Sequence, residues 1–258
     1  MATDSSQHIP PVTVAIPARL HSTRLPRKVL LDVAGQTMLQ RTHDVAVRAD
    51  CGPVVILTDA EEVAEAARAF GARVIMTDPE LESGTARIAS VIGLIEGEVV
   101  VNLQGDAPLT DPMILTEAAA QAARSRAPVT MPVYPMRDPA DVADPSVVKV
   151  VRGHDGRTLY CSRSPVPHVR DSDDPAGVGV TGAHWGHVGL YTYSREFLTS
   201  FDQLPPSALE RAERLEQLRW LEAGLQIHTF EVEPQGPSVD TLAQLESVRE
   251  SFAERAPA

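Results

Sequence analysis

Apolar residues recur along the first half of the chain in two alternating patterns, short strand-like runs and longer segments with helical spacing. Val12–Ile16 is the first apolar run, and Thr37–Ala49 follows it with apolar residues on one helical face. The same alternation predicts strands at Val54–Leu57, Arg73–Met76 and Glu98–Gln104, and helices from Asp59 to Phe70, near Thr85–Ile95 and from Asp111 to Arg124. Repeated strand–helix units predict an α/β fold with a doubly wound, mostly parallel sheet. A ligand crevice is then expected at the carboxyl ends of the strands.

The pattern changes beyond Pro128, where strands become frequent and their spacing irregular. Strands are expected at Val147–Val151, Leu159–Tyr160, His187–Tyr193 and Ile227–Val232, and helices at Ser207–Ala223 and from Thr241 onward. The polar, glycine-rich stretch 171–182 lacks a packing period and is expected to be a mobile loop. We therefore divide the chain into an α/β portion, residues 1–127, and a smaller strand-rich portion, residues 128–258, that returns to the main sheet.

Composition places the chain among globular proteins. Its 258 residues are 43% hydrophobic and 22% charged, which suits one large domain and excludes a fibrous or wholly disordered chain. It has no run of about 18 apolar residues and no signal-peptide pattern at its start, so we expect neither membrane insertion nor secretion. Two distant cysteines give neither a disulfide framework nor zinc spacing. A cytoplasmic location is expected.

The net charge of −12 argues against a nucleic-acid partner, because such a chain repels phosphate in general. Residues 5–31 are a local exception, since they contain no Asp or Glu. The basic residues in this segment are Arg19, Arg24, Arg27 and Lys28. Only Lys28 and Lys149 are lysines among the 23 Lys and Arg residues, and arginine does not replace a lysine at a tight phosphate site. Lys28 is therefore a candidate phosphate ligand, whereas Lys149 could position either a lid or a phosphate.

The loop after the first strand carries neither of the glycine-rich nucleotide motifs. No GxGxxG follows Val12–Ile16, which argues against a nicotinamide oxidoreductase, and no GxxxxGK[ST] occurs in the chain. Instead, residues 17–28 offer cations and hydroxyls that can surround a polyphosphate. The alternative is a solvated basic loop without a ligand.

Residues 16–28, IPARLHSTRLPRK, resemble the PAR-x-x-STRLP-x-K signature of the CMP-Kdo synthetases, the 3-deoxy-manno-octulosonate (Kdo) cytidylyltransferases. Further segments resemble the family in order along nearly the whole chain, at Ser83–Arg87, Val101–Asp106, Val147–Val150, Tyr160–Arg163, His187–Tyr191, Leu215–Arg219 and Val239–Thr241. The resemblance implies a fold like that of the nucleotide-diphospho-sugar transferases, with residues 1–127 binding the nucleotide and residues 128–258 serving acceptor binding and dimerisation. It also implies an enzyme that transfers CMP from CTP to a small acidic acceptor, uses Mg²⁺ and releases pyrophosphate. The enzyme is expected to be a homodimer.

The resemblance also assigns roles to residues. The implied catalytic residues are Lys28, Arg19 and Asp106, and the implied metal ligands are Asp106 and Asp240. Nucleotide contacts are implied for Arg19, Ser22, Thr23, Arg24, Lys28, Ser83 and Arg87. Acceptor contacts are implied for Arg27, Gln104, Arg163, His187, Tyr191, Glu216 and Gln217. These residue types suit the chemistry, since transfer from a triphosphate needs cations for the phosphates and carboxylates for the metal.

Three positions depart from the family pattern: Arg27 replaces a small residue, and Ala86 and Ala107 replace acids. If all three face the crevice, the site is more positive than usual, which favours an acceptor more negatively charged than a sugar acid. The segment before His187 also lacks the family's basic residue. We therefore predict a small phosphonate acceptor such as phosphonoformate. Authentic Kdo activity is the alternative, and a non-catalytic nucleotide-binding module is the alternative of another class.

Several of these residues also have purely structural interpretations. Asp106 could be a turn residue and Asp240 a helix cap. His187 could be a buried histidine with satisfied hydrogen bonds, Tyr191 a core aromatic, and Glu216 part of a solvated helix face. The surroundings of each side chain decide between the two interpretations.

Overall fold

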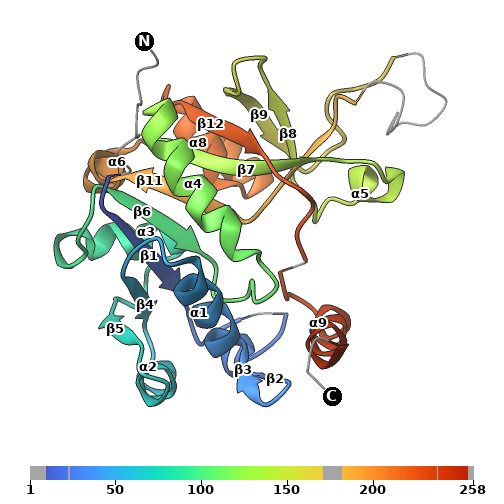
Figure 1. Ribbon diagram of the computed structural model, residues 1–258. Helices are drawn as coiled ribbons and strands as arrows, with labels where there is room; N and C mark the ends of the chain where they lie inside the picture. The colour runs from blue at the N-terminus through green and yellow to red at the C-terminus, as the bar shows by residue number, and fades with distance from the viewer. Residues whose placement is uncertain (1–9, 23, 171–181, 237, 255–258) are drawn as a thin grey trace, which may run out of the picture.

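A parallel block of four strands forms one half of the sheet. The computed structural model describes residues 10–22, 24–170, 182–236 and 238–254. The four strands lie in the order β5 (Arg73–Met76), β4 (Val54–Thr58), β1 (Val12–Pro17) and β6 (Val99–Leu103) (Figure 1). β1 and β6 are buried along their whole length, as apolar runs in the middle of a parallel sheet should be. The strands expected in this half are confirmed.

The sheet continues past β6 with strands of mixed direction. β11 (Leu190–Ser194) runs antiparallel to β6, and beyond it follow β7 (Val129–Pro135), β10 (Trp185–His187), β8 (Lys149–Arg152) and β9 (Thr158–Ser162). β12 (Ile227–Glu231) returns to the sheet and pairs in parallel with β7. The α/β fold is confirmed, with a parallel first half and a strand-rich second half in which antiparallel pairs predominate.

Helices cover both faces of the sheet, because the side chains of β1 alternate between two hydrophobic layers. Val14 and Ile16 belong to one layer and Ala15 to the other. The first layer is covered by α1 (Met38–Ala49), α2 (Glu61–Ala69) and α4 (Pro112–Ser125). The second is covered by α3 (Gly84–Ser90), α6 (Arg195–Ser200) and α8 (Glu216–Glu222) (Figure 1). The sheet is therefore doubly wound.

The remaining elements are short or peripheral. They are η1 (Lys28–Leu30), β2 (Asp32–Val33), β3 (Gln36–Thr37), η2 (Ile92–Leu94), α5 (Pro139–Ala143), η3 (Phe201–Gln203), α7 (Ala208–Glu213) and α9 (Leu242–Glu254). Within the described ranges, no helix combines the length and the apolar character needed to cross a bilayer.

Two expected elements are each divided in two. The helix expected over 207–223 is α7 followed by α8, because Arg214 between them adopts a left-handed backbone with φ 53°. The strand expected over 187–193 is the end of β10 followed by β11. The expectation of one continuous element is wrong in both places.

Two helix ends also differ from expectation. The helix expected near 85–95 ends at Ser90 and gives way to η2. Ala60, not Asp59, is the N-cap residue of α2, and the Asp59 carboxylate accepts a hydrogen bond from Arg87 instead. The loop expected to be mobile lies outside the described residues, apart from Gly182.

The C-terminal segment returns to the carboxyl edge of the parallel block. The backbone N–H of Val239 donates to the carbonyl of Asp106, just after β6, over 3.0 Å. The loops after β1 and β6 and the start of α9 therefore meet at the edge where the ligand crevice is expected.

Candidate active site

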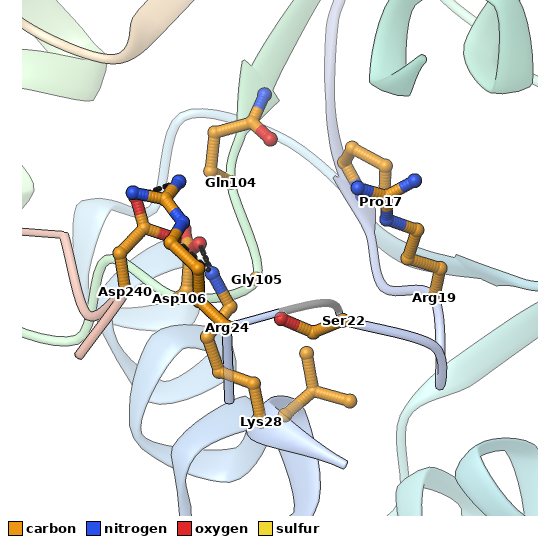
Figure 2. A pocket seen from close by; sticks show the side chains of 10 residues that line it. Pro17, Arg19, Ser22, Arg24, Lys28, Gln104, Gly105, Asp106 and Asp240 are labelled. Carbon is orange, nitrogen blue, oxygen red and sulfur yellow. Dashed lines mark hydrogen bonds and ion pairs between the residues drawn. The ribbon is translucent and has the colours of Figure 1, made fainter. Parts of the chain in front are cut away.

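The loop after β1 folds back so that Lys28 contacts Asp106, just after β6, and Arg24 and Lys28 contact Asp240. Arg27 takes a left-handed backbone, with φ 58°, and η1 begins directly after it at Lys28. This turn helps form a cavity of about 270 Å³. The cavity is lined by Pro17, Arg19, Ser22, Arg24, Lys28, Val29, Gln104, Gly105, Asp106 and Asp240 (Figure 2). Seven of the residues named from the sequence thus lie around one space.

Lys28 lies between the two aspartates assigned to the metal. Its ammonium group donates to Asp106 Oδ2 and to Asp240 Oδ1, the latter over 2.9 Å. Burial opposes its charge most strongly, but the two carboxylates outweigh burial and raise the pKa of Lys28 above its ordinary value. The Lys28 side chain is 11% exposed, so it is a charged group in a partly desolvated site.

Asp240 is held in place by the first turn of α9. Its backbone N–H donates to Gln244 Oε1 over 2.8 Å, while the backbone N–H of Gln244 donates to Thr241 Oγ1. Thr241 therefore caps the helix, and the carboxylate of Asp240 points into the cavity. Arg24 Nη2 donates to its second oxygen, Oδ2, over 2.8 Å. The interpretation of Asp240 as a mere helix cap is wrong.

Asp106 lies in a turn after β6, and its side chain also forms part of the candidate site. The backbone after β6 turns where the N–H of Ala107 donates to the carbonyl of Gln104 over 3.2 Å. The Asp106 carboxylate nevertheless faces Lys28 and lines the cavity. The side chain of Gln104 lies beside it and donates to Asn102 Oδ1 over 3.1 Å.

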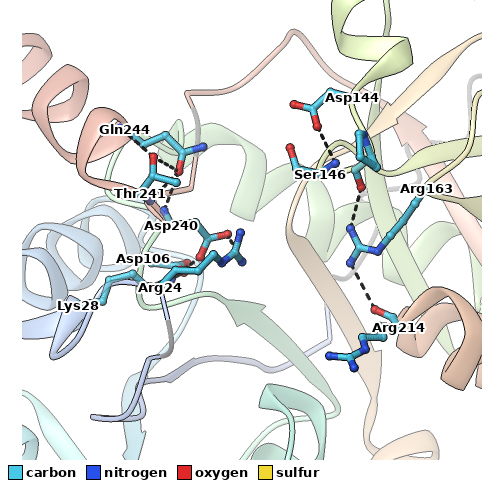
Figure 3. A network of polar contacts seen from close by, with 11 residues as sticks. Arg24, Lys28, Asp106, Asp144, Ser146, Arg163, Arg214, Asp240, Thr241 and Gln244 are labelled. Carbon is cyan, nitrogen blue, oxygen red and sulfur yellow. Dashed lines mark hydrogen bonds and ion pairs between the residues drawn. The ribbon is translucent and has the colours of Figure 1, made fainter.

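A second cavity, of about 600 Å³, adjoins the first. Arg24 and Asp240 line both cavities, so they mark the boundary between them. The wall of the larger cavity includes Ala107, Tyr134, Asp141, Asp144, Ser146, His187 and Gln244. Figure 3 shows Asp144 and Ser146 across from the group around Asp240. The site therefore has a small cationic compartment beside a larger, mixed one.

Two cations, the buried Lys149 and the partly buried Arg163, hold the far wall of the larger cavity. Lys149 Nζ donates to the carbonyls of Asp144 and Val147 over 2.8 and 2.7 Å. Arg163 donates to the carbonyl of Pro145 over 2.9 Å and to the carbonyl of Glu213 over 2.7 Å. Figure 3 shows its further contact with the carbonyl of Arg214, over 3.4 Å. Burial lowers the pKa of Lys149 below its ordinary value. Both side chains are committed to backbone carbonyls, so they position this wall.

Glu216 joins α8 to the start of α3. Its Oε1 accepts a hydrogen bond from Ser83 Oγ over 2.6 Å, and its Oε2 accepts one from Thr85 Oγ1 over 2.9 Å. Burial raises the pKa of Glu216. Ser83 also caps α3, because its hydroxyl accepts from the N–H of Ala86 over 3.1 Å. The interpretation of Glu216 as part of a solvated helix face is therefore wrong.

The rings of His187 and Tyr191 contact each other in a tilted arrangement, with ring centroids 5.0 Å apart and an interplanar angle of 36°. Tyr191 is buried, and its hydroxyl accepts a hydrogen bond from Gln217, as expected of a core aromatic. His187 lines the cavity, and its buried Nε2 has no hydrogen-bond partner in the described part of the chain. Burial lowers the pKa of His187 to about 4. His187 is thus not a histidine with satisfied hydrogen bonds.

Some residues named from the sequence do not line either cavity. Arg87 is buried in an ion pair with Asp59, with Nη2 and Oδ2 3.1 Å apart, and also donates to Thr77. The residues Ser83, Glu216, Gln217, Tyr191 and Arg163 are likewise absent from the linings of the two cavities. Thr23 lies outside the described residues. The ligand contacts assigned to these residues stay predictions.

The electrostatic argument for a more anionic acceptor fails at two of its three positions. Arg27 forms an ion pair with Glu62 on α2 and does not line either cavity. Ala86 packs against the hydrophobic layer beneath α3. Only Ala107 faces the larger cavity. The site is therefore not made more positive by Arg27 or Ala86.

Sequence reasoning missed the residues of the far wall and the partner of Arg87. Asp141 and Asp144 belong to an acid-rich segment around α5, and this clustering was the available signal. Asp59 directly follows a buried parallel strand, where polar side chains gather at the carboxyl edge. Neither signal belongs to a sequence motif that predicts a site residue.

The carboxylates of Asp106 and Asp240 suit a hard divalent cation. They approach the same point from two segments, and Mg²⁺ commonly binds through one or two carboxylates, with substrate phosphates and water completing its shell. Among the described residues there is no cluster of three or more His, Cys, Asp or Glu that could hold a metal by itself. The donor set therefore fits a metal shared with a phosphate ligand.

Comparison with known proteins bears on this geometry. A family model described as cytidylyltransferase matches residues 13–227. The chain is 44% identical over 248 residues to the 3-deoxy-manno-octulosonate cytidylyltransferase of Geobacter sulfurreducens, a match that covers 93% of this chain and 99% of that protein. It is 41% identical over 245 residues to the protein of the same name from Vibrio vulnificus, covering 93% and 98% of the two chains.

Solved structures give the same result. CMP:2-keto-3-deoxy-manno-octonic acid synthetase complexed with CTP aligns with a TM-score of 0.89 and 39% identity, covering 95% of this chain and 100% of that one. A nucleotidyl transferase from Methanothermobacter thermautotrophicus, at 16% identity and a TM-score of 0.61, shares the fold alone; that match covers 95% and 99% of the two chains.

Proposed function

This chain belongs to the cytidylyltransferase family and is a CTP-dependent nucleotidyltransferase, and we propose that its acceptor is 3-deoxy-manno-octulosonate. The observation that carries the proposal is the pair of adjoining cavities. Arg19, Arg24 and Lys28 surround the smaller one, which suits a triphosphate, and the larger one opens beside it. Substrates in the two cavities would meet near Arg24 and Asp240.

The reaction forms one bond and breaks one bond at the α-phosphorus of CTP. The acceptor's hydroxyl oxygen gives up its proton to solvent and joins this phosphorus, and the bond from the phosphorus to the oxygen that bridges the α- and β-phosphates breaks, so pyrophosphate leaves. Negative charge grows on the leaving pyrophosphate, and Lys28 is positioned to stabilise it. Arg19 and Ser22 on the same loop would hold the remaining phosphate oxygens.

We assign the metal ligands to Asp106 and Asp240 and expect the ion to be Mg²⁺. When bound, the ion would neutralise phosphate charge and orient the reacting oxygens. The family supports a divalent cation, and the two carboxylates supply the oxygen donors that Mg²⁺ prefers.

The relatives favour a sugar acid over a phosphonate. The similar proteins described above carry the name of the Kdo enzyme, and two of the three sequence departures do not reach the cavities. A phosphonate acceptor is therefore not supported. The homodimer, the cytoplasmic location and the division into a nucleotide portion, 1–127, and an acceptor portion, 128–258, stay predictions.

Pyrophosphate release over an acceptor panel tests this function. With CTP and Mg²⁺, we expect release with Kdo, and none with phosphonoformate or without acceptor. Glu117→Gln, which removes a carboxylate from the surface of α4, should leave the rate unchanged, whereas Asp106→Asn should abolish it. Release with phosphonoformate alone would contradict the acceptor assignment, and no release with any acceptor would point to a non-catalytic nucleotide-binding module.

A further inference from the structure

The carboxylates assigned to the metal already hold two cations of the same protein. Lys28 Nζ contacts Asp106 Oδ2 and Asp240 Oδ1, and Arg24 Nη2 contacts Asp240 Oδ2 (Figures 2 and 3). Three of the four carboxylate oxygens are thereby engaged. Both cations come from the loop after β1, and both line the cavity that suits the triphosphate.

A divalent cation and the Lys28 ammonium group cannot share these oxygens without repulsion. Like charges a few ångströms apart repel strongly where solvent is partly excluded, and Lys28 and Asp106 are only 11% and 19% exposed. The contacts of the Lys28 ammonium group therefore weaken the affinity of the Asp106 and Asp240 carboxylates for a metal ion. Anything that moves the ammonium group away increases that affinity.

A triphosphate is the natural competitor for these cations. It carries several negative charges, and guanidinium and ammonium groups form strong charge-assisted hydrogen bonds to phosphate oxygens. Lys28 has a flexible side chain, and the Arg24 side chain is 63% exposed, so both can turn towards a ligand in the cavity. The exchange needs no rearrangement of the sheet.

We propose that Lys28 and Arg24 are an internal counter-ion that blocks Asp106 and Asp240 until a nucleoside triphosphate draws them away. Nucleotide and divalent cation then bind interdependently, because each binds better once the other has removed the same ion pairs. This inference rests on the proposed function in taking Asp106 and Asp240 as the metal ligands and the cavity around Lys28 as the triphosphate site. It adds a binding order in which the metal enters with the nucleotide or after it.

A permanent structural ion pair is the competing explanation, and it makes a different prediction. If the ion pairs are permanent, Lys28 keeps its contacts with Asp106 and Asp240 when a nucleotide binds, and its surroundings do not change. The partial exposure of Asp240, 35%, and its position on a cavity wall favour the exchangeable counter-ion.

Binding of Mn²⁺ without nucleotide tests the proposal, followed by the electron paramagnetic resonance signal of the free ion. We expect Lys28→Met to bind Mn²⁺ more tightly than the unmodified protein, by about 5-fold to 150-fold, the usual range of coupling between sites. Adding Asp106→Asn to Lys28→Met should cancel the gain. Arg68→Met, which removes an exposed cation paired with Glu61 on α2, is the matched control and should change nothing. Equal or weaker Mn²⁺ binding by Lys28→Met would overturn the proposal.

Arg24→Gln gives a second test that does not depend on how Lys28→Met folds. It frees one oxygen of Asp240 and leaves Lys28 in place, so we expect a smaller but measurable gain in Mn²⁺ affinity. No gain in this variant would count against the proposal.

The displacement of Lys28 can be followed directly, because the chain contains only two lysines. Lysine labelled with ¹³C and ¹⁵N should give two side-chain NMR signals, of which Lys28→Met removes one. Metal-free CTP, added with a chelator, should shift the Lys28 signal and leave that of Lys149 unchanged. A Lys28 signal that does not move at saturating CTP would contradict the exchange. Failure to bind CTP at all would instead reject the proposed function, while the Mn²⁺ comparison would still decide the counter-ion.

Discussion

Arg87 and Asp59 form an ion pair inside the protein, with side chains only 3% and 9% exposed. Removing one partner leaves the other charge buried and unpaired, which costs about 3–5 kcal/mol. We therefore expect Arg87→Met to lower the free energy of unfolding by about that amount in urea titrations. The double variant with Asp59→Asn should lose much less than the sum of the two single losses. Strictly additive losses would show that the two groups do not interact.

His187 gives the stability of the protein a defined pH dependence. Its folded pKa, about 4, lies below the ordinary value of 6.5, so the unfolded chain binds a proton more readily than the folded protein. Its contribution to stability is therefore complete above pH 6.5 and is lost as the pH falls towards 4.

The variant His187→Gln should remove this dependence. Between pH 7 and pH 4.5, we expect the unmodified protein to lose about 2 kcal/mol more free energy of unfolding than the variant. Urea unfolding at the two pH values measures the difference. Equal losses in both proteins would mean that the His187 ring is not neutral in the folded state.

The role of a residue could be predicted where a residue type that is rare in this chain stands at a position suited to phosphate binding. Lys28 is one of two lysines in an arginine-rich chain and follows a buried strand, and it does line the cavity. Arg27 has the same charge, but its left-handed backbone turns it towards Glu62. Sequence carries no record of this backbone turn, so the site role predicted for Arg27 could not be distinguished from that of Lys28.

Arg163 ties three elements together. Its guanidinium donates to carbonyls after α5 and at the end of α7, and its backbone N–H, at the end of β9, donates to Glu213 Oε2 over 2.8 Å. Arg163→Met removes these side-chain hydrogen bonds, each of which contributes about 0.5–1.5 kcal/mol.

We expect Arg163→Met to lower the unfolding midpoint and to raise the KM for the acceptor more than it lowers kcat, because the wall at Asp144 and Ser146 loosens. Arg211→Met, which changes an exposed arginine on α7, is the matched control. Thermal unfolding together with acceptor kinetics provides the measurement. An unchanged KM would show that the wall does not position the acceptor.

Elements of the parallel half were predictable because strand and helix periods alternate there without interruption. The second half was harder, and Arg214 shows why. The apolar stripe of 207–223 runs through it, but the left-handed backbone at Arg214 ends one helix and starts another. Glycine commonly marks such a position and arginine does not, so the break leaves no sign in the sequence.

At the scale of the whole molecule, a cavity lined by basic side chains lies in a protein of acidic net charge. A net charge of −12 is offset locally, because the acid-free segment after β1 faces Asp106 and Asp240 across the carboxyl edge of the sheet. The family and the fold could be predicted from motifs that span the chain. The acceptor could not, because the phosphonate interpretation required Arg27 and Ala86 to face a crevice that they do not line.

The fate of the α-phosphorus tests the central claim most directly. The protein is incubated with Kdo, Mg²⁺ and CTP that carries a radioactive α-phosphorus, and the products are separated. We predict that the label appears in a Kdo adduct and that unlabelled pyrophosphate is released in equal amount. Label that stays in free CTP, CDP or CMP while Kdo is unmodified would contradict the assignment of this protein as a Kdo cytidylyltransferase.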